Sequence, residues 1–119
     1  MITLYGISNC DTVKKARKLL DDRRIDYQFH DFRKQGLDAR QVNTWLKDLG
    51  IDQLINKRSR TWKSLSETEQ AALQTAKAAD LVLQHPTLIK RPLLEISAGK
   101  SPVQRLVGFD KDRYLALFS

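Results

Sequence analysis

The residue with the clearest capacity for covalent chemistry is Cys10, the only cysteine in the sequence. It follows the polar pair Ser8-Asn9 and precedes a run with helical spacing that contains two adjacent lysines. The first N–H groups of a helix lack partners and carry partial positive charge, so a sulfur placed there is favoured as the reactive thiolate. Asp11 opposes this effect, because one carboxylate disfavours a second anion beside it.

A free cysteine can also be a buried, inert small hydrophobe. The polar loop before Cys10 and the helix after it favour a reactive thiol instead. Val13 stands where a Cys-x-x-Cys pair would have its second cysteine. Any disulfide made by Cys10 must therefore join it to another molecule.

Length and composition indicate one soluble domain that spans residues 1–119, with 41% hydrophobic and 29% charged residues. No apolar run approaches the roughly 20 residues of a membrane span, and no signal-peptide pattern opens the chain. With the single cysteine, this predicts a cytoplasmic protein without membrane association. Nothing in the sequence suggests an obligate dimer, so we expect a monomer.

The net charge of +7, from 21 Lys+Arg against 14 Asp+Glu, suits an anionic partner, although solvated lysines also serve solubility. Residues 56–60 hold three of the cations and can form either a solvated loop or an anion-binding loop, because guanidinium groups bind oxyanions and carboxylates bidentately. Nucleic-acid binding is not expected, since core packing explains the neighbouring Trp62 better than base stacking. No metal site is expected either, because His30 and His85 are far apart in the sequence.

The first 32 residues predict a strand–helix–strand unit with parallel strands. Residues 1–5 are largely apolar, residues 11–23 have helical spacing, and Ile25, Tyr27 and Phe29 alternate with polar residues. A basic loop is expected over residues 33–36.

A helical block follows, over about residues 37–85. Asp38 is a predicted N-cap and Gly50 a C-cap signal for the first helix. Ser66 and Glu69 form a predicted capping box that opens an alanine-rich region with a break near Asp80.

Residues 93–96 and 103–107 then predict a hairpin, and Asp110 can cap a last helix. This is the order of elements in the thioredoxin fold: an α/β protein with a mixed four-stranded sheet, formed by residues 1–32 and 87–119, and a helical insertion. That fold keeps a cysteine at the start of its first helix and a cis-proline beside it. Pro92 occupies the position of that proline, although the sequence leaves its isomer open.

Three segments resemble the ArsC/Spx family, in particular its short YffB-like branch: Tyr5–Cys10, Asn56–Ser59 and His85–Pro92. The resemblance covers essentially the whole chain. It implies that Cys10 is the nucleophile that attacks arsenic or a disulfide sulfur. It also implies that Arg91 binds the oxyanion and stabilises the thiolate. Asn56 and Arg58 are both candidates for the position of a second site arginine.

The sequence departs from the two named activities of this family. Arsenate reductases of this kind have a further arginine near the end of the hairpin, where Arg105 is the nearest cation. They also have a serine where this chain has Val13. Spx-type regulators commonly have a Cys-x-x-Cys switch, which is absent here.

The sequence therefore predicts a cytosolic monothiol reductase that uses glutathione as co-substrate and binds no cofactor. Cys10 and Arg91 are the predicted catalytic residues. The predicted contacts to substrate or glutathione are Asn9, Asn56, Arg58, Pro92 and Arg105, with glutaredoxin as a further candidate partner. The alternatives are arsenate reduction proper and an Spx-like regulatory module that binds RNA polymerase.

Overall fold

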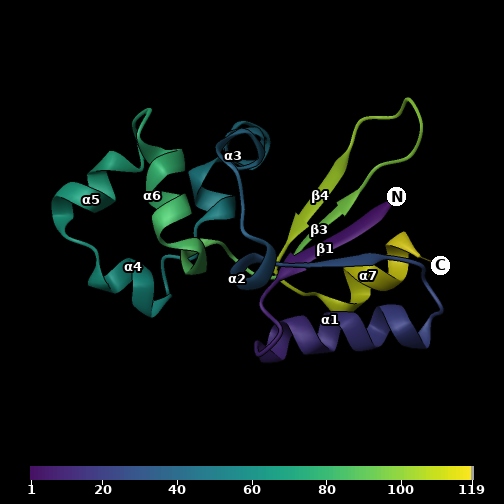
Figure 1. Ribbon diagram of the computed structural model, residues 1–119. Helices are drawn as coiled ribbons and strands as arrows, with labels where there is room; N and C mark the ends of the chain where they lie inside the picture. Colours follow the sequence, from purple (N-terminus) through teal and green to yellow (C-terminus); the bar gives the residue numbers. More distant parts are fainter. Residues whose placement is uncertain (119) are drawn as a thin grey trace. The chain divides into compact units, whose positions relative to one another are not determined.

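The computed structural model describes residues 1–118, which form two compact units (Figure 1). The first unit combines residues 1–35 with the chain from Arg91 onward, and the second is Gly36–Lys90. Across residues 1–118, no helix combines the length and the apolar character that a membrane crossing requires.

The first unit is built on a four-stranded sheet with the order β2-β1-β3-β4. Its strands are β1 (Ile2–Gly6), β2 (Gln28–Asp31), β3 (Leu93–Ile96) and β4 (Gln104–Val107). β1 and β2 are parallel, whereas β3 is antiparallel to both β1 and β4. The predicted mixed α/β sheet, its parallel first pair and its hairpin are confirmed.

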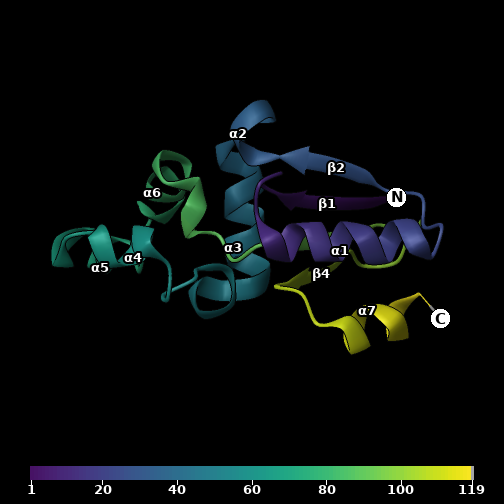
Figure 2. The same cartoon turned by 90° about the horizontal axis from the view of Figure 1, so that it is seen from below.

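Two helices, α1 (Asp11–Asp22) and α7 (Lys111–Leu117), lie on the same face of this sheet (Figures 1 and 2). Leu4 and Leu94 are register partners on that face, and they pack with Ala16, Leu20 and Tyr114 in one buried cluster. Full burial of each large apolar side chain contributes about 1.5–3 kcal/mol to the free energy of unfolding. This cluster therefore fixes α1 against the sheet.

The end of β1 packs directly on the first turn of α1. A Cβ atom added at Gly6 would lie 2.7 Å from Cγ2 of Val13, which is closer than real Cβ contacts come. Val13 itself is fully buried. Glycine at position 6 therefore lets the strand deliver the loop of residues 7–10 to the helix start without displacing Val13.

The predicted basic loop at residues 33–36 is wrong, because α2 (Phe32–Gln35) forms a single helical turn there. The Asp31 carboxylate accepts hydrogen bonds from the N–H groups of Arg33 at 2.8 Å and Lys34 at 3.3 Å. It acts as the side-chain cap of this turn. Arg24, with a φ of 57°, precedes β2, which starts at Gln28 rather than at the predicted Ile25.

The second unit is helical: α3 (Ala39–Leu54), α4 (Arg60–Ser64), α5 (Glu67–Ala72), α6 (Ala78–Gln84) and a 3₁₀ turn, Pro86–Leu88. Asp38 caps α3 as predicted, and the Ser66–Glu69 capping box is confirmed in both directions. Gly50 has non-helical backbone angles (φ 77°, ψ 165°), so α3 consists of two helical segments joined by a kink, and the first segment ends at the predicted C-cap signal. The alanine-rich region forms two helices, as predicted, but the break between them lies at residues 73–77 rather than near Asp80, which is inside α6.

Candidate functional site

Cys10 is the N-cap residue of α1, as the sequence predicted. Its backbone is extended (φ −98°, ψ 124°), and its carbonyl accepts a hydrogen bond from the Lys14 N–H at 2.9 Å. Its own N–H donates to the Ile7 carbonyl at 3.2 Å, which closes the turn that follows β1. No side chain caps this helix start, and Cys10 is partly exposed. Cys10 therefore lies at the positive end of a 12-residue helix and is not fully buried.

The strand register brings Arg91-Pro92 to the same end of the central strands as the Cys10 loop. This end of the sheet, with residues 7–10, Arg91 and Pro92, is called the Cys10 edge below. Tyr5 is the register partner of Leu93, so β1 ends where β3 begins. Residues 7–10 leave the sheet at this edge, and Arg91-Pro92 enters it there. The Arg91–Pro92 peptide bond is cis, and the Pro92 carbonyl accepts a hydrogen bond from the Gly108 N–H at 2.9 Å. Cys10, Arg91 and Pro92 are thus gathered on one side of the first unit.

Arg91 is partly buried, and its guanidinium makes no ion pair or hydrogen bond within residues 1–118. A guanidinium offers five donors in a planar fork that matches carboxylates and oxyanions. Asn9 is exposed in the turn directly before Cys10. The edge therefore presents a thiol, an unpaired cation and an exposed amide.

Asp31, which was not among the site residues predicted from the sequence, holds the Cys10 loop in place. Its carboxylate accepts a hydrogen bond from the Ser8 N–H at 3.1 Å, in addition to those from Arg33 and Lys34. Asp31 is the register partner of Gly6 and is only 4% exposed. It is the only charged side chain buried in the described part of the chain. The available signal was an aspartate immediately before a short run that can form a helical turn.

Hydrogen bonding keeps the Asp31 carboxylate ionised. Burial by itself would raise the pKa of Asp31, but the donated N–H groups of Arg33, Ser8 and Lys34 outweigh it, so the pKa lies below its ordinary value. Hydrogen bonds to an ionised acceptor are about twice as strong as neutral ones. The loop that carries Cys10 is therefore tied to a buried anion through Ser8.

Arg105 is not brought to the Cys10 edge. It lies on β4 opposite Glu95, which is the register partner of Thr3 rather than of the end of β1. Its Nε donates to Oε2 of Glu95 at 2.8 Å, and both side chains are mostly buried, with 13% and 21% exposure. The other oxygen of Glu95 accepts from the Tyr5 hydroxyl at 3.4 Å. Arg105 is thus committed to a cross-strand ion pair.

The two remaining predicted residues, Asn56 and Arg58, belong to the second unit. The Asn56 side-chain oxygen accepts a hydrogen bond from the Arg58 N–H at 3.0 Å, and the Asn56 carbonyl accepts from the Ser59 hydroxyl at 2.7 Å. Ser59 in turn caps α4 through the Trp62 N–H. Asn56 therefore shapes the loop, whereas the Arg58 side chain is exposed and makes no ion pair within residues 1–118.

The described residues contain no cluster of three or more histidine, cysteine, aspartate or glutamate side chains that could hold a metal ion. What the Cys10 edge can do follows from its own groups. A partly exposed thiol at a helix start is a group type suited to nucleophilic attack, and the arginine on the same edge is a residue type suited to binding anions.

Known relatives and solved structures are similar to this chain over its whole length. A protein of Haemophilus influenzae without an assigned role is 44% identical over 119 residues, with both chains covered completely. The global transcriptional regulator Spx of Streptococcus pyogenes is 25% identical, over all of this chain and 86% of its own.

Among solved structures, the YFFB protein superposes with a TM-score of 0.89 at 39% identity, covering both chains fully. An arsenate reductase (ArsC) related protein of Brucella melitensis superposes with a TM-score of 0.75 at 42% identity, over 98% of this chain and 93% of its own. The ArsC family pattern matches residues 5–117. The chain therefore belongs to the ArsC family, as its sequence motifs suggested.

Proposed function

We propose that the protein is a cytosolic, glutathione-dependent monothiol reductase in which Cys10 attacks a disulfide. The observation that carries this proposal is the position of Cys10 at the uncapped start of α1, partly exposed and held by a loop that Asp31 anchors. A thiol that served only packing would gain nothing from this position. Membership of a family related to arsenate reductases supports thiol chemistry at the same residue.

The reaction needs an external thiol, because the chain has no second cysteine. In the first step, the Cys10 thiolate attacks the glutathione sulfur of a mixed disulfide, and the substrate thiolate leaves. In the second step, the thiolate of free glutathione attacks the glutathione sulfur on Cys10. This step forms oxidised glutathione and regenerates the Cys10 thiolate. The net reaction converts one glutathionylated substrate and one free glutathione into the reduced substrate thiol and oxidised glutathione, so the free glutathione is the reductant.

Glutathione is a small peptide with two carboxylates, and the Cys10 edge has groups that suit it. The Arg91 guanidinium has no ion-pair partner among residues 1–118, so it can form a charge-assisted pair with a carboxylate. The Pro92 carbonyl is occupied by Gly108, whereas no backbone hydrogen bond of Arg91 occurs in the described part of the chain. The Arg91 backbone is therefore the segment on which a glutathione backbone would pair as an added strand.

The test is reduction of a glutathionylated peptide in the presence of glutathione, coupled to glutathione reductase and NADPH. Arg91→Ala should lower kcat/KM by roughly 10- to 100-fold, because a hydrogen bond to a charged group contributes about 1.5–3 kcal/mol. Lys90→Ala is the matched control: it removes the exposed neighbouring cation and should have little effect. Equal loss in both variants, or turnover that persists in Cys10→Ser, would contradict the proposal.

Arsenate reduction is the second candidate, favoured by the resemblance to the Brucella melitensis arsenate reductase related protein. Arg91 would then bind the oxyanion while Cys10 attacks arsenic. Arg105 does not complete an arginine set at this edge, since Glu95 holds it. Arsenate-dependent oxidation of glutathione in the presence of glutaredoxin would establish this activity, and its absence would leave disulfide reduction.

A further inference from the structure

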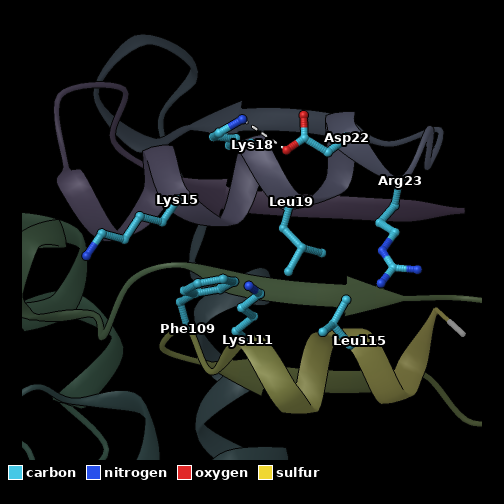
Figure 3. A pocket seen from close by; sticks show the side chains of 8 residues that line it. All are labelled: Lys15, Lys18, Leu19, Asp22, Arg23, Phe109, Lys111 and Leu115. Atoms are coloured by element: carbon cyan, nitrogen blue, oxygen red, sulfur yellow. Dashed lines mark hydrogen bonds and ion pairs between the residues drawn. The ribbon is translucent and has the colours of Figure 1, made fainter.

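A groove lies between α1 and α7 in the first unit, away from the residues assigned to the Cys10 edge. It has a volume of about 510 Å³, and Figure 3 shows side chains of both helices along it. The reductase chemistry proposed above uses none of its lining residues. The proposed reductase function therefore does not account for this groove.

The floor of the groove is apolar and firmly held. Leu19 comes from α1, Leu115 from α7, and Phe109 from the segment that leads into α7 (Figure 3). Leu19 is 9% exposed, and the Phe109 ring packs edge-on against the buried Tyr114 with centroids 4.9 Å apart. Because these side chains are fixed by the core, the groove does not need to reorganise before it binds an apolar group.

The rim of the groove is mainly cationic. Lys15, Arg23 and Lys111 line it, and none of the three makes an ion pair within residues 1–118. The rim also contains Lys18 and Asp22, which neutralise each other across 3.0 Å. In Figure 3, Lys15 and Arg23 stand toward opposite ends of the groove, with the apolar floor between them.

The spacing of these cations sets the size of a matching ligand. Lys15 lies in the second turn of α1 and Arg23 is its C-cap residue, eight positions later, which corresponds to about 12 Å between their backbones along the helix axis. An extended peptide covers about 3.3 Å per residue. Two carboxylates four residues apart, with apolar side chains between them, therefore match the two ends and the floor together.

We propose that this groove docks an acidic segment of a partner protein, in which apolar side chains are flanked by carboxylates. The floor supplies the apolar contact, and the unpaired cations supply charge complementarity to both flanks. A purely anionic ligand would leave the floor unused, and a neutral apolar ligand would leave the cations unused. The proposal is independent of Cys10, which is absent from the groove lining.

The experiment measures binding of a fluorescein-labelled peptide, Glu-Glu-Leu-Ser-Phe-Glu-Glu, to the full chain by fluorescence anisotropy at low salt. Two peptides of equal length are controls, one with every Glu changed to Lys and one with Leu and Phe changed to Ser. Both controls should bind at least about tenfold more weakly. Added salt should weaken binding of the acidic peptide, because the rim charges are exposed to solvent.

Protein variants locate the site. Lys15→Glu and Arg23→Glu should each weaken peptide binding about fivefold, since each reverses one exposed charge at the rim. Lys100→Glu reverses an equally exposed charge outside the groove and should bind normally, as should Cys10→Ser. Circular dichroism checks the fold of each variant, and Lys111→Gln provides a milder change at the same rim.

Equal binding of the acidic and lysine peptides, or equal loss in Lys15→Glu and Lys100→Glu, would overturn the proposal. Vesicles of phosphatidylcholine with phosphatidylglycerol are the competing probe. Binding to these vesicles without binding to the peptide would mean that the groove recognises a lipid surface instead. Cys10→Ser protein should bind the peptide as tightly as wild type, because Cys10 does not line the groove. This test therefore remains valid even if the reductase proposal fails.

Discussion

The helices α1 and α3 differ in whether a side chain caps the unpaired N–H groups at their starts. At α3, the Asp38 carboxylate accepts a hydrogen bond from the Gln41 N–H at 2.7 Å, so the helix start is capped. At α1, the corresponding residue is Cys10, whose side chain caps nothing. α1 has 12 residues and α3 has 16 with a kink at Gly50, and both begin after an extended residue.

This difference separates a helix start that serves stability from one that carries a reactive group. A cap stabilises a protein by about 1 kcal/mol, so leaving it out has a measurable cost. At α1 the N-cap residue carries a thiol instead of a capping oxygen, and no side chain caps the positive end of the helix. The loop that carries Cys10 is stabilised at another point, where the Ser8 N–H donates a hydrogen bond to the Asp31 carboxylate.

Cys10→Ser gives the largest expected effect, because it converts the start of α1 into one like that of α3. Turnover of a glutathionylated peptide should fall to the rate without protein, since the nucleophile is lost. Stability should rise by about 1 kcal/mol, because serine is a good N-cap. Chemical denaturation and the coupled assay measure the two quantities. A purely structural cysteine would give the opposite sign in stability.

Asp31→Ala tests how the Cys10 loop is held. The variant removes an ionised acceptor of three backbone N–H groups and should lower the free energy of unfolding by about 3 kcal/mol. Hydrogen exchange at the Ser8 amide should accelerate more than at amides of α7. Asp31→Asn keeps one acceptor oxygen and should lose less. Slow exchange at Ser8 in the alanine variant would show that Asp31 does not anchor this loop.

Acid should reproduce part of this loss. Because folding lowers the pKa of Asp31 below its ordinary value of 3.8, its contribution is fully present above that value and is lost as the pH falls below it. The difference in unfolding free energy between wild type and Asp31→Asn should therefore shrink on acidification below about pH 4. A difference that stays constant down to pH 2 would contradict the assignment.

Asp38→Ala sharpens the comparison from the structural side. Loss of the cap of α3 should lower the free energy of unfolding by about 1 kcal/mol. Asp38→Ser is the matched control, because serine supplies another capping oxygen and should restore most of the loss. Urea denaturation measures both variants. Equal stability of the alanine and serine variants would show that the hydrogen bond to Gln41 contributes nothing.

Tyr114→Phe gives the smallest expected change. The Tyr114 hydroxyl is buried without a hydrogen-bond partner among the described residues, and burial raises the pKa of this phenol. Removing an unpaired buried hydroxyl should leave stability unchanged or raise it by up to about 1 kcal/mol. A clear loss of stability would indicate an unseen partner for the hydroxyl.

Local patterns in the sequence predicted most of the fold and the place of Cys10. The apolar spacing of Val13, Ala16, Leu19 and Leu20 defined α1, and capping oxygens at Asp38 and Ser66 marked two further helices. These signals act within a few residues of each other. Such local signals can therefore be recognised without knowledge of the tertiary structure.

Features that depend on register or on very short elements could not be predicted. The single turn of α2 has too few residues to show a helical period, and its cap, Asp31, is also the last residue of a strand. Arg105 was a candidate for anion binding because its partner, Glu95, becomes visible only when β3 and β4 are aligned. The anchoring role of Asp31 depends in the same way on the pairing of β1 with β2.

The most direct test of the central claim is the intact mass of the folded protein after incubation with oxidised glutathione over a pH series. We predict a single glutathione adduct on Cys10 of the folded protein, because this free thiol is partly exposed. Cys10→Ser should give none. A folded protein that forms no adduct at any pH, but reacts readily once unfolded, would show that Cys10 is a buried packing residue and would contradict the account.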